Sequence, residues 1–278
     1  MARTRPTAIA IEKEKMRIDQ LLVQRQLAST RSQAQRLIAG GVEWLQGEVW
    51  RRVAKNGDEV PDDAPVRLLD DSEARYVSRG GLKLEAALNQ VGLSVTGLQC
   101  LDVGQSTGGF TDCLLQRGAA YVVGVDVGSA QLHPSLRADP RVLCVEKINA
   151  RALKAADLTA AYALTEMSAP NPSIDFVPEF DLIVADLSFI SQTLVLPAVV
   201  PLLKAGGTLL TLVKPQFELQ PGQVGKGGIV KDAAMYALVE QRLRETCAAL
   251  GLTVTAWFDS PITGGDGNRE FFICARKL

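Results

Sequence analysis

The sequence has few of the residues that build metal centres and disulfide frameworks. It contains a single histidine, His133, so we do not expect a metal cage built on histidine. Its five cysteines are scattered, and no two of them form a C-x-x-C pair. Three of the five lie in apolar, strand-like runs, which favours buried thiols in a reducing cytosol. We therefore expect a cytoplasmic protein that holds no metal ion.

Long apolar runs are also lacking. The N-terminus has no apolar core of the signal-peptide type. The most apolar region, Leu182 to Leu203, is interrupted by Asp186, Pro197 and Pro201, and it predicts a buried strand followed by a helix. No insertion into a membrane is expected.

Charge is unevenly distributed, although the formal net charge is only −1. Residues 1–55 carry 11 basic and 5 acidic side chains, whereas the remaining residues carry 19 basic and 26 acidic ones. A basic N-terminal region followed by an acidic remainder predicts that the N-terminal region binds a polyanion. A merely solvated, charged surface is the alternative interpretation.

Residues 16–66 have the pattern of a small α+β domain. The stretch "RIDQLLVQRQL" predicts one helix, and "STRSQAQRLIAGG" predicts a second that Ser29 or Thr30 caps. A short hairpin around Gln46–Gly47 follows. Residues 67–79 are the expected linker to a second domain over residues 80–278.

Two short helices followed by strands, with arginines on the second helix, resemble the small RNA-binding domain named after the fourth ribosomal protein of the small subunit. The resemblance implies contacts with RNA backbone and shape, and a small protein–protein module is the alternative. The candidate RNA-binding residues are Arg25, Arg31, Arg36, Arg51 and Arg52, with Arg79 and Lys226 from the second domain.

In the second domain, apolar strand-like runs alternate with helical ones. Continuous apolar strands separated by helices predict an α/β fold with an open, mostly parallel sheet that is covered on both faces. Ligands of such sheets bind beyond the carboxyl ends of the strands. The expected strands are "CLDV", "YVVGVD", "RVLCVE", "FDLIVAD", "GTLLTLVK", "LTVTAWF" and "EFFICAR".

The stretch "LDVGQSTGGF" places a loop of small residues directly after the first of these strands. Its spacing differs from the G-x-G-x-x-G of dinucleotide folds and is that of an S-adenosylmethionine pocket. In this interpretation the loop holds the methionine part, Asp126 accepts from the ribose hydroxyls, and "VEKINAR" meets the adenine. A plain α/β turn without a ligand is the alternative. The expected cofactor-binding residues are Asp102, Gly104, Ser106, Thr107, Gly108, Gly109, Phe110, Asp126, Val127, Asn149 and Asp186.

Eight motifs together resemble the TlyA-type (haemolysin A) family of FtsJ-like ribosomal RNA 2′-O-methyltransferases: "SRGGLKLEAAL", "LDVGQSTGGFTD", "VDVG", "INAR", "ADLSFIS", "LVKPQFE", "GKGGIVKD" and "GNREFF". The resemblance implies a Rossmann-like methyltransferase sheet, mostly parallel with the last strand antiparallel. It also implies S-adenosylmethionine as cofactor, a ribose 2′-hydroxyl as acceptor, and ribosomal RNA or ribosomal subunits as partners. Asp266 is a departure, since the family commonly has a lysine there.

The resemblance further implies a catalytic Lys-Asp-Lys-Glu tetrad, which falls on Lys83, Asp186, Lys214 and Glu270. The strand pattern supports this assignment, because it places all four at the ligand edge of the sheet. A lysine beside the 2′-oxygen can stabilise a developing alkoxide or, when neutral, take the proton. The sulfonium leaves as a neutral thioether, so the reaction needs no metal.

Three other functions remain possible from the sequence. Methylation of an exocyclic base amine is one, because "DLSF" loosely resembles the Asn/Asp-Pro-Pro-Tyr/Phe motif, although the prolines are missing. The others are a membrane-acting haemolysin and a non-catalytic RNA-binding assembly factor. The stretch "QPGQVGKGG" is not a phosphate loop, because Lys226 is followed by Gly227, and it predicts a basic active-site flap.

Overall fold

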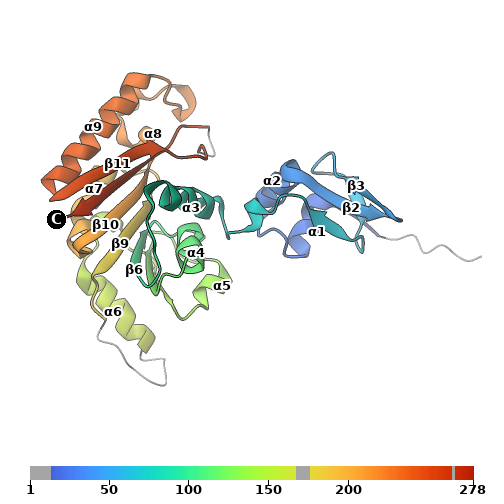
Figure 1. The fold of residues 1–278 in the computed structure, drawn as a ribbon, viewed down its shortest axis with the longest axis horizontal. Coiled ribbons are helices and arrows are strands. Elements are labelled where there is room, and N and C mark those ends of the chain that lie inside the picture. Colours follow the sequence, from blue (N-terminus) through green and yellow to red (C-terminus); the bar gives the residue numbers. More distant parts are fainter. Residues whose placement is uncertain (1–13, 167–175, 265–266) are drawn as a thin grey trace, which may run out of the picture. The chain divides into compact units, whose positions relative to one another are not determined.

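The computed structural model describes residues 14–166, 176–264 and 267–278 (Figure 1). The chain divides into two compact units between Arg75 and Tyr76. This point lies within the predicted linker, and the domain bounds at residues 66 and 80 stay predictions. The departure at Asp266 lies outside the described residues.

The N-terminal unit combines two helices with short antiparallel strands. Thr30 caps the second helix, because its hydroxyl accepts a hydrogen bond from the Gln33 N–H at 3.2 Å. The predicted helices and hairpin are confirmed. The elements are β1 (Lys15–Arg17), α1 (Ile18–Gln24), α2 (Arg31–Gly41), β2 (Val42–Gln46), β3 (Val49–Arg52), β4 (Glu59–Pro61), β5 (Val66–Leu68) and the short turn η1 (Ser72–Ala74).

Strand β2 lies between β3 and β5, while β1 pairs with β4. Because the apolar positions of α1 and α2 fall on one side of each helix, the two helices bury them against these strands. The resulting core contains Ile18, Leu21, Leu22, Ala34, Leu37, Ile38, Val42, Val53 and Val60.

The C-terminal unit is built on a seven-stranded sheet in the order β11-β12-β10-β9-β6-β7-β8. Strand β12 is antiparallel to both of its neighbours, and the other pairs in this sheet are parallel. The predicted fold class is thus confirmed. The strands are β6 (Gln99–Val103), β7 (Tyr121–Val125), β8 (Val142–Val145), β9 (Phe180–Asp186), β10 (Leu203–Val213), β11 (Leu252–Asp259) and β12 (Phe271–Lys277).

Helices cover both faces of this sheet (Figure 1). The helices and 3₁₀ helices are α3 (Arg79–Val91), α4 (Gly109–Gln116), α5 (Pro134–Arg137), η2 (Ala150–Ala152), α6 (Ala155–Glu166), α7 (Gln192–Val199), η3 (Val200–Leu202), α8 (Pro215–Glu218), η4 (Pro221–Gln223), η5 (Lys226–Gly228) and α9 (Ala233–Ala249). Alternate residues of β9 point to opposite faces. Leu182 and Val184 therefore share a core with residues of α3, α4 and α5, while Ile183 and Ala185 share a core with residues of α6, α7 and α9.

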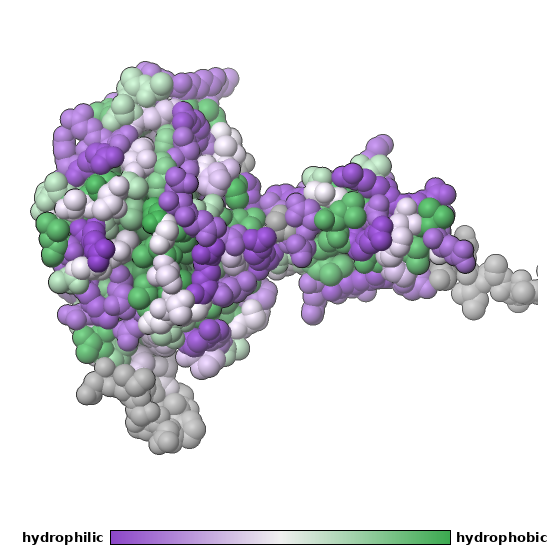
Figure 2. All heavy atoms as spheres, in the orientation of Figure 1, coloured by the Kyte–Doolittle hydropathy of each residue, from purple (hydrophilic) through white to green (hydrophobic). Residues whose placement is uncertain are grey.

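The five cysteines are free thiols, and all except the half-buried Cys144 are buried. Burial raises the pKa of the Cys113 thiol to about 12. Figure 2 shows hydrophilic and apolar side chains interspersed over the visible face of the C-terminal unit. Within the described ranges, no helix is both long enough and apolar enough to cross a membrane.

Candidate active site

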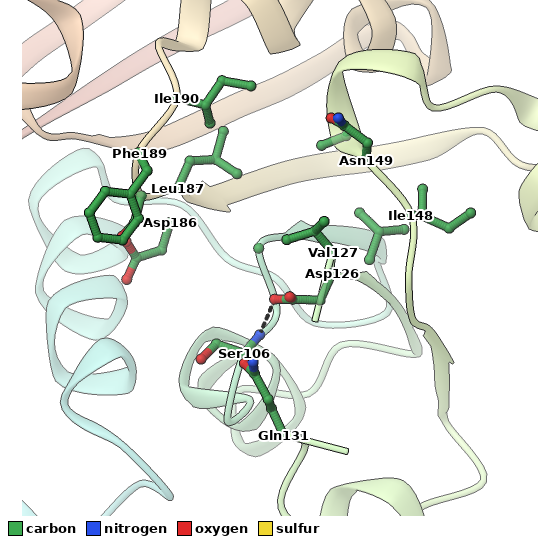
Figure 3. A pocket seen from close by; sticks show the side chains of 14 residues that line it. Ser106, Asp126, Val127, Gln131, Ile148, Asn149, Asp186, Leu187, Phe189 and Ile190 are labelled. Atoms are coloured by element: carbon green, nitrogen blue, oxygen red, sulfur yellow. Dashed lines mark hydrogen bonds between the residues drawn. The ribbon is translucent and has the colours of Figure 1, made fainter. Parts of the chain in front are cut away.

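Two adjoining pockets lie at the carboxyl edge of the parallel strands, where β6 separates the β7–β8 side of the sheet from the β9–β10 side, and Figure 3 shows the larger of the two. This switch in strand order is where open α/β sheets bind ligands. The larger pocket, of about 420 Å³, is lined by residues at the ends of β6, β7, β8 and β9. The smaller, of about 210 Å³, shares Asp186 and Ser188 with it and adds Lys214 and the start of α3.

Most of the expected cofactor residues line these pockets, namely Gly104, Ser106, Thr107, Gly109, Phe110, Asp126, Val127, Asn149 and Asp186. Asp102 and Gly108 line neither pocket. A Cβ on Gly108 would lie 2.4 Å from the Leu136 side chain, so this glycine is required for packing against α5. A Cβ on Gly104 would lie 2.6 Å from the Asp186 carbonyl oxygen, so this glycine lets the loop approach the end of β9.

Asp126 joins the loop that follows β6 to the loop that follows β7. Its Oδ2 accepts a hydrogen bond from the Ser106 N–H (Figure 3) and its Oδ1 accepts one from the Gly128 N–H, both at 2.7 Å. A carboxylate has about four acceptor positions, so each oxygen keeps capacity for a hydroxyl donor. The walls around it include the apolar side chains of Val127 and Ile148.

Asp102 lines neither pocket and is the last acceptor of a buried hydrogen-bond chain. Gln105 donates to the Thr111 hydroxyl at 2.9 Å, and this hydroxyl donates to Asp102 Oδ2 at 2.7 Å. Burial raises the pKa of Asp102 to about 7, because desolvation of its carboxylate outweighs the hydrogen bond from Thr111. Gln105 and Thr111 were not among the expected site residues, and their hydrogen bonds join the loop after β6 to Asp102.

The four residues of the predicted tetrad form two ion pairs. Lys214 Nζ lies 2.6 Å from Asp186 Oδ1, and Lys83 Nζ contacts Glu270 Oε2. The sequence suggested that Lys214 is the last residue of its strand and that Glu270 is the first residue of its strand. In the structure each lies one residue outside, because Lys214 directly follows β10 and Glu270 directly precedes β12. Val213 pairs with Phe271 across these antiparallel strands, so the residues just beyond them, Lys214 and Glu270, lie at the same edge of the sheet.

The two ion pairs differ in their access to the pockets. Asp186 and Lys214 belong to the pocket wall, whereas the Lys83 and Glu270 side chains are only 10% and 3% exposed and line neither pocket. Lys214 Nζ also donates a hydrogen bond to the Ser188 hydroxyl at 3.0 Å. Of the two lysine amines, only that of Lys214 therefore belongs to a pocket wall among the residues that the structure describes.

Phe189 is a site residue that the sequence analysis missed. Its side chain is 90% exposed, its backbone φ is +64°, and its ring lies 4.9 Å from that of Phe217. In Figure 3, Phe189 and Asp186 lie on the same side of the pocket, opposite Ile148 and Asn149. An aromatic ring so exposed beside a pocket provides a surface for another planar group.

Three of the predicted RNA-binding arginines have partners within the N-terminal unit. Arg31 contacts the buried Asp19 at 2.9 Å, Arg36 contacts Glu73 at 2.7 Å, and Arg25 donates to the Ala64 carbonyl oxygen at 2.6 Å. The hydrogen bond from Arg17 and that from Arg31 hold the pKa of Asp19 far below its usual range.

The other four candidates for RNA contact are placed differently. Arg51 and Arg52 are exposed on β3, and neither forms an ion pair with a residue in the described ranges. Arg79 donates to the Thr263 carbonyl oxygen at 3.3 Å. Lys226 is exposed on η5. An RNA contact for each of the seven stays a prediction.

The glycine-rich loop around Lys226 is held by Asn268, which is 1% exposed. The Asn268 side chain accepts from the Val230 N–H at 3.0 Å and donates to the Gly228 carbonyl oxygen at 2.9 Å. Asn268 lies two residues before Glu270, so this loop is fastened next to the tetrad. Within the described part of the chain, no three His, Cys, Asp or Glu side chains are grouped so that they could hold a metal ion.

The C-terminal unit matches the FtsJ-like methyltransferase family over residues 76–277. The chain belongs to this family. Residues 16–41 match the S4 domain, which confirms the predicted pairing of an S4 domain with an FtsJ-like methyltransferase. Membership of a methyltransferase family implies S-adenosylmethionine as the methyl donor.

Two relatives and one solved structure resemble nearly the whole chain of this FtsJ-like protein. The 16S/23S rRNA (cytidine-2′-O)-methyltransferase TlyA of Mycobacterium tuberculosis is 41% identical over 260 residues, which are 94% of this chain and 89% of the relative. Hemolysin A of Brachyspira hyodysenteriae is 35% identical over 92% of this chain and 98% of its own. A Streptococcus thermophilus structure described as a candidate hemolysin shares 38% identity, with a TM-score of 0.69 over 95% of this chain and 89% of that one.

Proposed function

We propose that this protein transfers the methyl group of S-adenosylmethionine to a ribose 2′-hydroxyl of ribosomal RNA. The observation that carries this proposal is the Lys214 amine, which lines the smaller pocket and contacts Asp186 and Ser188, two residues that line both pockets. The relative named as a cytidine-2′-O-methyltransferase and the match to an S4 domain support this acceptor and RNA as the partner. A ribosomal substrate implies that the protein acts in the cytoplasm.

The larger pocket suits the adenosine part of the cofactor. Asp126 would accept hydrogen bonds from the ribose hydroxyls, because both of its oxygens retain acceptor capacity. The apolar side chains of Val127, Ile148 and Leu187 suit the faces of an adenine ring, and Asn149 supplies a polar group at the same wall. Ser106, Thr107 and Gly109 of the loop would hold the methionine part in the smaller pocket.

The cofactor supplies an electrophilic methyl group on a sulfonium and leaves as a neutral thioether. The acceptor hydroxyl must lose its proton as the new carbon–oxygen bond forms, because a neutral ribose hydroxyl is a poor nucleophile. The Lys214 amine is the group that would contact this oxygen, either taking the proton or stabilising the developing negative charge. Asp186 and Ser188 orient that amine, and the Lys83–Glu270 pair supplies fixed charge behind it.

The exposed ring of Phe189 supports a nucleotide as the acceptor. Proteins that recognise single-stranded RNA commonly stack an unpaired base on an aromatic side chain, which contributes about 1–3 kcal/mol per base. Phe189 is three residues from Asp186 and its ring is in solvent. A base stacked on this ring would bring its own ribose towards Lys214.

The experiment is methyl transfer from S-adenosylmethionine with a labelled methyl group to isolated ribosomal subunits, followed by complete digestion of the RNA to nucleosides. We expect the label on the ribose of one nucleoside type. Label on a base would contradict the proposal and would favour methylation of an exocyclic amine. Incubation of the same protein with anionic vesicles tests the haemolysin alternative, which requires vesicle binding under conditions that support RNA binding.

A further inference from the structure

Glu218 is a buried carboxylate that the proposed chemistry does not use. It is 4% exposed and ends α8, four residues after Lys214. Its Oε1 accepts from the Gln192 N–H at 2.8 Å, and its Oε2 accepts from the Ser191 hydroxyl at 2.5 Å. Both partners lie at the start of α7, which follows the loop that carries Ser188 and Phe189, and this loop begins directly after Asp186 at the end of β9.

The contacts of Glu218 are the last of a series between two segments. One segment follows β9 (residues 187–192), and the other follows β10 (residues 214–218). Lys214 contacts Ser188, Phe217 contacts Phe189, and Glu218 contacts Ser191 and Gln192, in the same order along both segments. The Gln192 side chain also donates to the Leu212 carbonyl oxygen at 2.7 Å, which fastens the far end of the loop to β10.

The start of α7 does not require a carboxylate. Ser191 already caps this helix, because its hydroxyl accepts from the Thr193 N–H at 3.2 Å. Burial of an acid is costly, and burial raises the pKa of Glu218 against the effect of its two hydrogen bonds and of Arg242. A contribution to folding alone therefore leaves the choice of a glutamate at this position unexplained.

Phe189 shows what the loop needs from its surroundings. Its positive φ is a conformation that non-glycine residues adopt only when neighbouring structure holds it. Its ring is almost fully in solvent, so burial of the ring does not supply the restraint. The restraint on the Phe189 backbone comes from the two ends of the loop. At one end Asp186 is the last residue of β9, and at the other Ser191 and Gln192 donate hydrogen bonds to Glu218.

We propose that Glu218 is a positioning residue, which fastens the loop after β9 to the segment after β10 and so fixes the Lys214 amine and the Phe189 ring relative to each other. This inference rests on the proposed function, since Lys214 and Phe189 are its proposed contacts with the ribose and the base. Glu218 lines neither of the two pockets. Its effect on methyl transfer comes through geometry alone.

The test compares Glu218→Ala with Glu218→Gln in the full-length protein. Alanine removes both acceptors, and we expect kcat for methylation of ribosomal subunits to fall roughly tenfold to a hundredfold, the usual effect of displacing a positioned group by about 1 Å. Glutamine can accept from the Gln192 N–H and donate to the Ser191 hydroxyl, so it should retain a kcat within about threefold of the wild type. KM for the RNA should change less than kcat in both variants.

A matched control separates positioning from simple loss of stability. Leu158→Ala removes a fully buried side chain of α6, which lies on the sheet face away from α3 and packs against the edge strand β8. Assayed below the melting temperatures of both variants, Leu158→Ala should keep its kcat, whereas Glu218→Ala should not. Equal losses of kcat in the two variants would overturn the inference. If Glu218→Ala does not fold, Ser191→Ala, which removes one of the two contacts together with the side-chain cap of α7, should show a smaller loss of kcat that still exceeds the loss in Leu158→Ala.

Hydrogen exchange of the free protein distinguishes failure of this inference from failure of the proposed function. Amides of residues 187–193 should exchange at least about tenfold faster in Glu218→Ala than in the wild type, whichever atom of the RNA is methylated. Unchanged protection of these amides, or a kcat within about twofold of the wild type, would show that Glu218 does not hold the loop. Faster exchange together with label on a base would retain the role of Glu218 and reject the ribose acceptor.

Discussion

Lys83 and Glu270 are 187 residues apart in the chain, yet their side chains form a buried ion pair at the carboxyl edge of the sheet. One partner belongs to the first helix of the C-terminal unit and the other directly precedes its last strand. The pair lies next to the Lys214–Asp186 pair, because Val213 and Phe271 are opposite each other in β10 and β12. Two lysines and two carboxylates thus lie together, and one of the two amines, that of Lys214, lines the smaller pocket.

The first prediction concerns the stability of this buried pair. Glu270→Leu leaves the Lys83 ammonium without its partner, and it should lower the free energy of unfolding by about 3–5 kcal/mol. The double variant Lys83→Met/Glu270→Leu should recover most of that loss, because no uncompensated charge remains buried. Methyl transfer should stay impaired in both. Urea unfolding provides the measurement, and a single variant that loses less than about 1 kcal/mol would show that the pair is solvated.

The second prediction concerns the accessible amine. Lys214→Ala should reduce methyl transfer by about a hundredfold or more, the usual effect of removing a positioned acid–base or electrostatic group. Binding of S-adenosylmethionine and of RNA should remain. Lys214→Arg should not restore the rate, because guanidinium is larger, planar and permanently charged. Single-turnover transfer at saturating enzyme measures the effect, and a near-normal rate for the alanine variant would remove Lys214 from the mechanism.

The third prediction concerns cofactor affinity. Asp126→Ala removes the acceptor for the ribose hydroxyls and the two hydrogen bonds that join the Ser106 and Gly128 loops. Each charge-assisted bond to the ribose contributes about 1.5–3 kcal/mol, so affinity should fall at least tenfold. Calorimetric titration checks this, with Asp139→Ala as the control, because Asp139 pairs with Arg141 and lines neither pocket. Equal affinities for both variants would place the ribose elsewhere.

The fourth prediction concerns pH. The folded-state pKa of Asp102, about 7, lies above the ordinary 3.8, so the folded protein binds this proton more tightly than the unfolded chain does. The stability contribution of Asp102 is therefore greatest below about pH 4 and falls by up to about 4 kcal/mol as the pH rises to 7 and above. Asp102→Asn should flatten this part of the profile. Unfolding free energies of both proteins between about pH 4.5 and 8 provide the comparison, and identical profiles would mean that Asp102 titrates normally.

The fifth prediction separates RNA contact from structure in the N-terminal unit. Arg51→Ala/Arg52→Ala should leave stability unchanged and flatten the salt dependence of RNA affinity, by roughly one unit of slope for each lost phosphate contact. Arg31→Ala should in addition destabilise the unit, because Asp19 stays buried with one guanidinium fewer. An unaltered salt slope in the double variant would exclude β3 from the RNA-binding surface.

The strands of the C-terminal unit could be predicted because both faces of the sheet are covered, so each strand is a continuous apolar run. The convergence of Asp186 and Lys214 followed from the rule that parallel strands end at one edge. The contacts of individual side chains could not be predicted from the sequence. Nothing in the sequence indicates that Phe189 is exposed with a positive φ, or that Arg31 is committed to Asp19, since both depend on contacts between separate elements. The role of Gly108 in packing was hidden for the same reason.

The place of β12 in the sheet has a consequence for the order in which the molecule can be assembled during translation. Strands β6 to β9, which carry most of the proposed cofactor pocket, are made early, whereas β12 is made last and inserts between β10 and β11. Until Phe271–Lys277 has left the ribosome, the facing edges of β10 and β11 have unpaired backbone groups, and Glu270 has not reached Lys83. A nascent chain can therefore form the proposed cofactor pocket at the ends of β6 to β9 before Glu270 can pair with Lys83 beside it.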